Sequence, residues 1–92
     1  MRLLNRVNRF GMQFRLREIF GNPDKTSVHY GEKSMVVPAS IQEMSDGWFL
    51  WVQSGSLVQN AFPKLDVDQR EFLITGLLPE EWEEKFPAED EQ

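Results

Sequence analysis

The spacing of apolar residues predicts a helix at the start of the chain. Leu3, Val7 and Phe10 recur at i, i+4 and i+7, with Leu4 beside them. This spacing puts them on one face of a helix over residues 1–10. The adjacent polar stripe consists of Arg2, Arg6, Arg9 and Gln13. The sequence therefore predicts a basic amphipathic N-terminal helix.

The period changes after this segment. Met12, Phe14 and Leu16 alternate with polar residues, and such alternation is the period of a strand. A continuing helix over residues 12–20 is the alternative, and the pattern favours neither. Turn-forming residues at positions 21–24 end the element in both cases.

Two short strands are predicted next. Residues 26–30 and 34–37 are rich in β-branched and aromatic side chains and flank a Gly-containing loop. This arrangement indicates a hairpin. Pro38 ends the second strand because it has no N–H to donate to a ladder.

Helices with local start signals follow. Ser40 and Glu43 fit a capping box that begins a helix running to about residue 53. Its apolar face consists of Ile41, Met44, Trp48, Trp51 and Val52. Asp66 and Gln69 fit a second capping box, and the helix that they begin ends at a glycine, Gly76.

The last predicted helix covers residues 79–86, where Pro79 suits the first position. The expected fold class is a small α+β domain. It consists of a β-hairpin or three-stranded meander followed by three short helices, with the basic helix in front. The expected organisation is a basic arm or helix over residues 1–20, a domain over residues 21–87 and an acidic tail over residues 88–92.

Charge is divided unevenly along the chain. The 92 residues carry a net charge of −5, but residues 1–33 hold seven Lys or Arg and three acidic residues. That part has a net charge of +4, and residues 34–92 have a net charge of −9. The asymmetry indicates a basic segment that contacts an anionic partner or docks on the acidic body.

The candidate binding residues are the arginines of the N-terminal segment, namely Arg2, Arg6, Arg9, Arg15 and Arg17. With Phe10 and Phe14 interleaved, they could grip phosphates and stack on bases of a nucleic acid. An anionic membrane is the less favoured partner. Docking of the segment on its own acidic body, or on an acidic protein, is the other alternative.

Composition excludes several classes of site. The chain has no Cys and one His, so disulfides, Cys nucleophiles and multi-histidine metal sites are excluded. His29 is interpreted as a surface or packed residue, and capping explains Asp66 and Asp68 better than metal binding does. No apolar run approaches the roughly 18 residues of a membrane span. We expect a protein that is not an enzyme and needs no cofactor or metal.

The tryptophans have two interpretations. Trp48 and Trp51 share a helix face, which is typical of core residues, but either could be an interface anchor because Trp is enriched in hot spots. A chain of this size with three Trp and seven Phe is expected to leave apolar surface exposed. That surface favours a protein partner or a homo-oligomer.

One run of residues resembles a class of short uncharacterised bacteriophage proteins. The shared pattern is Gln59-x-Ala61-Phe62-Pro63, Arg70-Glu71-Phe72-Leu73-x-Thr75-Gly76 and Pro79-x-x-Trp82, within about residues 34–86. Some members carry a Cys-x-x-Cys near the last motif, which this chain lacks, so no metal site is implied. The resemblance implies a viral origin and a place in the host cytoplasm or the virion.

Three hypotheses of function follow. The first is a non-enzymatic phage-type binding protein whose basic segment contacts nucleic acid or an acidic protein surface. The second is a structural or assembly component of a virion that self-associates through exposed aromatic residues. The third is an inhibitor of a host or defence protein, whose acidic face mimics a phosphate backbone.

Overall fold

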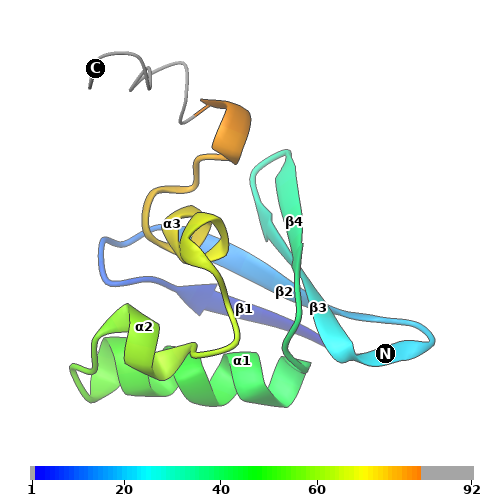
Figure 1. Ribbon diagram of the computed structural model, residues 1–92, viewed down its shortest axis with the longest axis horizontal. Helices are drawn as coiled ribbons and strands as arrows, with labels where there is room; N and C mark the ends of the chain where they lie inside the picture. Colours follow the sequence, from blue (N-terminus) through cyan, green and yellow to red (C-terminus); the bar gives the residue numbers. More distant parts are fainter. Residues whose placement is uncertain (1, 82–92) are drawn as a thin grey trace.

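A four-stranded antiparallel sheet is followed by short helices in this protein (Figure 1). The computed structural model describes residues 2–81. The strands are β1 (Leu3–Val7), β2 (Gln13–Ile19), β3 (Asn22–Tyr30) and β4 (Lys33–Val37), and they form a meander in that order. The prediction of a small α+β domain is confirmed, with four strands in place of two or three.

The predicted N-terminal helix is wrong, because the segment forms the edge strand β1. A spacing of four residues is also even, so it puts Leu3 and Val7 on one face of a strand as well as on one face of a helix. That face is exposed, whereas Leu4 lies opposite Leu16 and packs against the core. An isolated helix of about ten residues is only marginally stable in water. Pairing with β2 gives the backbone of this segment stable hydrogen-bond partners instead.

The strand alternative for residues 12–20 is confirmed. Phe14 and Leu16 of β2 are fully buried, while the alternating Arg15 and Arg17 are exposed. Two alternating faces are what a strand in a half-covered sheet requires.

The predicted hairpin is confirmed as β3 and β4. β3 begins earlier than predicted, at Asn22, because the turn from β2 is tight and Gly21 takes a φ of +84°. The pairing of β3 with β4 begins at Thr26. Pro23 lies outside this pairing, so its missing N–H costs the β3–β4 ladder no hydrogen bond.

Four helical segments follow the sheet: α1 (Ile41–Trp48), the π-helical η1 (Phe49–Gln53), α2 (Val58–Ala61) and α3 (Val67–Thr75). Both predicted capping boxes are present. The Ser40 hydroxyl accepts a hydrogen bond from the Glu43 N–H at 3.1 Å, and the Asp66 carboxylate accepts one from the Gln69 N–H at 2.9 Å.

The end of α3 also follows its prediction, since Gly76 takes a left-handed φ of +74°. A helical turn begins at Pro79. The remainder of the predicted helix over residues 79–86, and the predicted tail over residues 88–92, lie outside the described residues.

The core lies between the sheet and the helices. Its fully buried large side chains are Phe14, Leu16, Val28, Val37, Met44, Phe72 and Leu73. Trp48 and Trp51 belong to this core, with 2% and 3% of their surface exposed and ring centroids 5.6 Å apart. The Trp48 indole N–H donates to the Val7 carbonyl at 2.8 Å. Neither tryptophan is exposed as an interface anchor.

Candidate functional site

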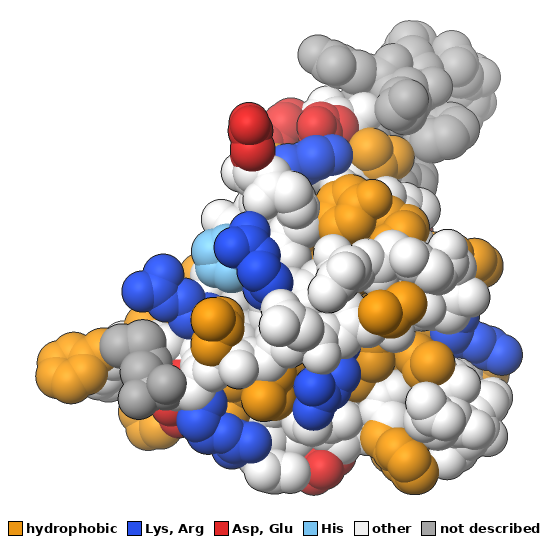
Figure 2. All heavy atoms as spheres, turned by 180° about the vertical axis from the view of Figure 1, so that it is seen from behind, with side chains coloured by type: hydrophobic (Ala, Val, Ile, Leu, Met, Phe, Trp, Pro, Cys, Tyr) orange, Lys and Arg blue, Asp and Glu red, His pale blue; other side chains and the backbone are white. Residues whose placement is uncertain are grey.

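The helices cover one face of the sheet, and the other face is open to solvent (Figures 1 and 2). Strand alternation defines what we call the basic sheet face. It consists of two rows across the four strands: Asn5, Arg15, His29 and Ser34, and beside them Leu3, Arg17, Ser27 and Val36.

A shallow groove of about 320 Å³ lies on the basic sheet face. Its lining residues are Arg2, Leu3, Arg15, Arg17 and His29. Figure 2 shows the histidine among Lys and Arg side chains, with acidic side chains toward the edges of the view. The register explains the grouping, because His29 lies directly opposite Arg15.

Hydrogen bonds orient two of these side chains. Arg15 Nη2 donates to the Gly31 carbonyl at 3.0 Å, which holds the guanidinium toward the β3–β4 turn. A guanidinium has five N–H donors, so most of them stay available to a ligand. His29 Nε2 lies 2.8 Å from the Ser27 hydroxyl, two residues away on the same face.

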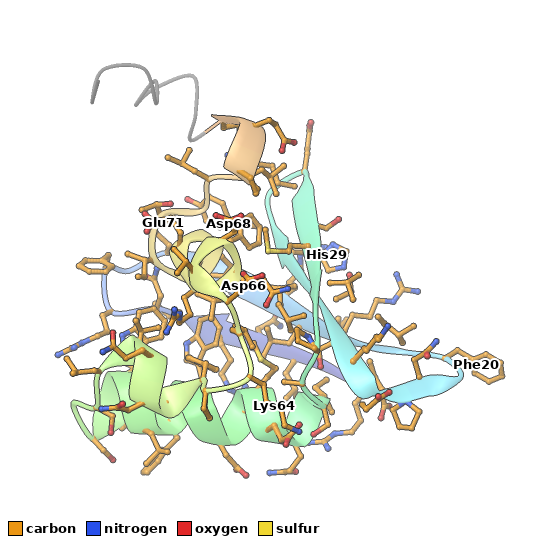
Figure 3. The ribbon with its side chains drawn as sticks, viewed as in Figure 1. Phe20, His29, Lys64, Asp66, Asp68 and Glu71 are labelled. Atoms are coloured by element: carbon orange, nitrogen blue, oxygen red, sulfur yellow. The ribbon has the colours of Figure 1, made fainter. Side chains whose placement is uncertain are left out.

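The basic sheet face is not neutralised by the acidic body within residues 2–81. The two ion pairs there join Lys33 to Glu81 at 3.1 Å and Lys64 to Glu43 at 2.6 Å, and neither uses an arginine. Figure 3 shows Asp66 at the start of α3, with Asp68 and Glu71 on that helix, whereas His29 belongs to β3. Within the described residues, the arginines of the basic segment therefore form no ion pair with a carboxylate.

The field of the two arginines reaches His29. Burial of the ring lowers the pKa of His29 below its ordinary value of 6.5, and the positive charges of Arg15 and Arg17 lower it further. The neutral form of the imidazole therefore predominates at pH 7. An anion in the groove would meet the positive charges of Arg15 and Arg17, that of Arg2 at the rim, and one further group able to gain a charge.

The other predicted arginines lie elsewhere. Arg6 turns toward α1, where its Nη2 donates to the Ser45 hydroxyl at 3.0 Å. Arg6 also lines a second cavity, of about 380 Å³. Arg9 is exposed in the β1–β2 turn, and Arg2 is at the rim of the groove with Nη1 3.4 Å from Gln42 Oε1. The predicted helical stripe of Arg2, Arg6 and Arg9 does not form.

Sequence reasoning did not select His29 as a binding residue. Ser27 and His29 are two residues apart, so β3 places them on one face. The sequence pattern does not contain the register between β2 and β3, and this register brings the ring beside Arg15.

Two phenylalanines are exposed at the two ends of β2. Phe10 in the β1–β2 turn has 66% of its surface exposed, and Phe20 in the β2–β3 turn has 87%. Figure 3 shows Phe20 at the tip of its hairpin, directed away from the body. A flat aromatic ring in this position can stack on a base. The two rings do not form one continuous patch.

Comparison with known proteins finds no matching family model, no matching curated protein and no matching solved structure. Within residues 2–81, no helix is long and apolar enough to cross a lipid bilayer. The same residues contain no group of three or more His, Asp or Glu that could hold a metal ion. Functional inference therefore rests on the geometry of the basic sheet face.

Proposed function

We propose that this protein is a non-enzymatic binding protein whose basic sheet face binds a single strand of nucleic acid. The observation that supports it best is the pair Arg15 and Arg17, exposed side by side on an uncovered sheet without a carboxylate partner in the described residues. Phosphate contacts by such side chains supply most of the affinity of sequence-independent binding.

The spacing along β2 suits a linear polyanion. Arg15 and Arg17 are two residues apart, which is roughly 7 Å along a strand. Successive phosphates of an extended nucleic-acid strand repeat over a comparable distance. The uncharged neighbours Asn5, Ser27 and Ser34 offer hydrogen bonds without repelling a phosphate.

The width of the sheet favours a single strand over a duplex. Four strands about 4.8 Å apart span roughly 14 Å between the outer strand axes. The major groove of B-form DNA is about 12 Å wide and admits a helix or a two-stranded ribbon. A single strand can instead lie along β2, with Phe10 and Phe20 near the two ends of that strand available to its bases.

The test compares matched charge reversals of three exposed arginines. R15E and R17E change the basic sheet face, and R9E makes the same change in the β1–β2 turn. Fluorescence anisotropy with a labelled oligothymidylate of about twelve nucleotides measures the affinity of each full-length variant. We expect R15E and R17E each to weaken binding about tenfold and R9E to have little effect.

Salt dependence provides a second measurement. The logarithm of the association constant falls with the logarithm of salt concentration, by about 0.7 for each phosphate neutralised on a single strand. R15Q should therefore reduce the slope by about 0.7. An equal loss of affinity in R9E and R15E would argue against the basic sheet face, and tighter binding of a duplex of the same length would contradict the single-strand geometry.

A further inference from the structure

The groove of the basic sheet face contains one side chain that titrates near neutral pH, His29. Binding by arginines alone does not require such a group. The ring is half-buried, and its Nε2 is held 2.8 Å from the Ser27 hydroxyl. Its second ring nitrogen has no partner within residues 2–81. The ring therefore has one nitrogen fixed by its own strand and one left for a ligand.

We propose that a phosphate group in this groove is held jointly by Arg15, Arg17 and the protonated ring of His29, so that binding takes up one proton. The proton comes from solvent and adds to the imidazole, and no bond of the phosphate breaks. Both ring nitrogens then carry a proton, one donating to Ser27 and one to a phosphate oxygen. Because the phosphate would belong to a nucleic-acid strand, this step rests on the proposed function.

The charges around the ring give the direction of the effect. In the free protein, burial and then the guanidinium groups of Arg15 and Arg17 lower the pKa of His29. A phosphate between these groups adds negative charge beside the ring and supplies an acceptor for the new N–H, and both changes raise that pKa. Affinity should therefore increase as the pH falls toward the pKa of the free ring.

The other groups around His29 are not among the causes of its lowered pKa. Across the register on β4 lies Ser34, which is uncharged, and Lys33 beside it is bonded to Glu81 on the other face of the sheet. Glu32 is in the β3–β4 turn, and Arg2 is at the rim of the groove. α1 packs on the opposite face.

His29 is the single histidine of the chain, so NMR follows its titration without interference. The ring resonance of the full-length protein is titrated with pH in sodium chloride and in inorganic phosphate of equal ionic strength. The chloride sample controls for screening of the arginines. We expect the pKa of His29 to be higher in phosphate than in chloride, and R15Q to remove the difference.

The second arm measures the affinity of the oligothymidylate at about pH 7.5 and pH 5.5 for the wild-type protein and for H29Q. Phosphodiesters do not titrate over this range. We expect the wild-type protein to bind several-fold more tightly at the lower pH, and a tenfold preference for the protonated ring sets the upper limit of this change. H29Q should show little pH dependence.

The outcomes separate the two proposals. Equal pH dependence in H29Q and the wild type, with R15E still weakening binding, would overturn the role of His29 and leave the proposed function intact. A higher pKa of His29 in phosphate, with no oligonucleotide bound at either pH, would support the phosphate site and overturn the proposed function. No response to either probe would overturn both.

Discussion

Gly47 shows how a single position can oppose its local propensity. Glycine in a helix costs about 1 kcal/mol relative to alanine, so its place inside α1 is unfavourable by that measure. A Cβ atom there would lie 2.6 Å from the Ala61 carbonyl oxygen and 2.6 Å from Cε1 of Phe62. α1 can approach the end of α2 this closely because residue 47 has no side chain.

Replacing this glycine should therefore lower stability, even though the helix propensity rises. We expect G47A to reduce the free energy of unfolding by about 1–3 kcal/mol, the usual cost of overpacking a filled site. Urea denaturation followed by tryptophan fluorescence measures the change. An unchanged or higher midpoint would mean that the α1–α2 contact relaxes at little cost.

Asn8 is a second residue whose role depends on distant groups. It is almost fully buried, and its Nδ2 donates to the Leu73 carbonyl at 2.9 Å while its Oδ1 accepts from the N–H groups of Phe10 and Met12. One amide therefore joins the β1–β2 turn to the end of α3. A local pattern gives no indication of this link, because the partners are 65 residues apart.

At the scale of elements, the open edge of β1 is protected by side chains. The Asn5 carbonyl accepts from Arg6 Nη1 at 2.8 Å, and the Val7 carbonyl accepts from the Trp48 indole at 2.8 Å. Edge strands with free carbonyls invite pairing with other chains, and natural proteins block them. Arg6 therefore has a structural contact on β1, which separates it from the arginines of the basic sheet face.

The start of α1 depends on a charged capping residue. Glu43 accepts a hydrogen bond from Lys64 at 2.6 Å and one from the Ser40 N–H at 2.8 Å, and these contacts lower the pKa of Glu43. A lowered pKa in the folded state means that the ionised group stabilises the fold above its ordinary pKa of about 4.5. That contribution is lost as the pH falls through the lowered value.

E43Q keeps the shape of the capping residue and removes its charge. We expect E43Q to be slightly less stable than the wild type at pH 7, and the difference to shrink toward about pH 3 as Glu43 takes up a proton. Urea denaturation at the two pH values measures the difference, with E32Q in the exposed β3–β4 turn as the control. A difference that persists unchanged in acid would assign the effect to shape and not to charge.

At the scale of the whole molecule, the N-terminal segment is part of the fold. Residues 2–20 contribute two of the four strands and two fully buried core residues, Phe14 and Leu16. The opposite charges of the chain also become two surfaces, with the basic sheet face on one side and the acidic residues of α3 on the other. A protein of net charge −5 can in this way present a positive face.

A chain lacking residues 1–20 should therefore fail to fold. Loss of Phe14 and Leu16 removes the centre of the core, and each such side chain contributes about 2–5 kcal/mol, which is a large part of the stability of a small domain. We expect no near-UV circular dichroism and no cooperative unfolding transition. L3S, which changes an exposed residue of the same segment, should fold normally. A folded truncated chain would restore the interpretation of a separate arm.

The elements that sequence reasoning predicted correctly are those specified by short-range contacts. Ser40 with Glu43, and Asp66 with Gln69, cap helices across three residues, and Gly76 ends a helix through its own backbone conformation. The error fell on residues 1–10, where Leu3 and Val7 fit both periods. There the outcome depended on pairing with β2, which the pattern of one segment does not contain.

The sequence by itself determined the start of α1, both ends of α3, the β3–β4 hairpin and the unequal distribution of charge, because each depends on neighbours along the chain. The tertiary structure alone decided that β1 is a strand, that Arg6 lies away from the basic sheet face and that His29 lies on it. These results depend on register and on which face the helices cover, and both are set by contacts between distant segments.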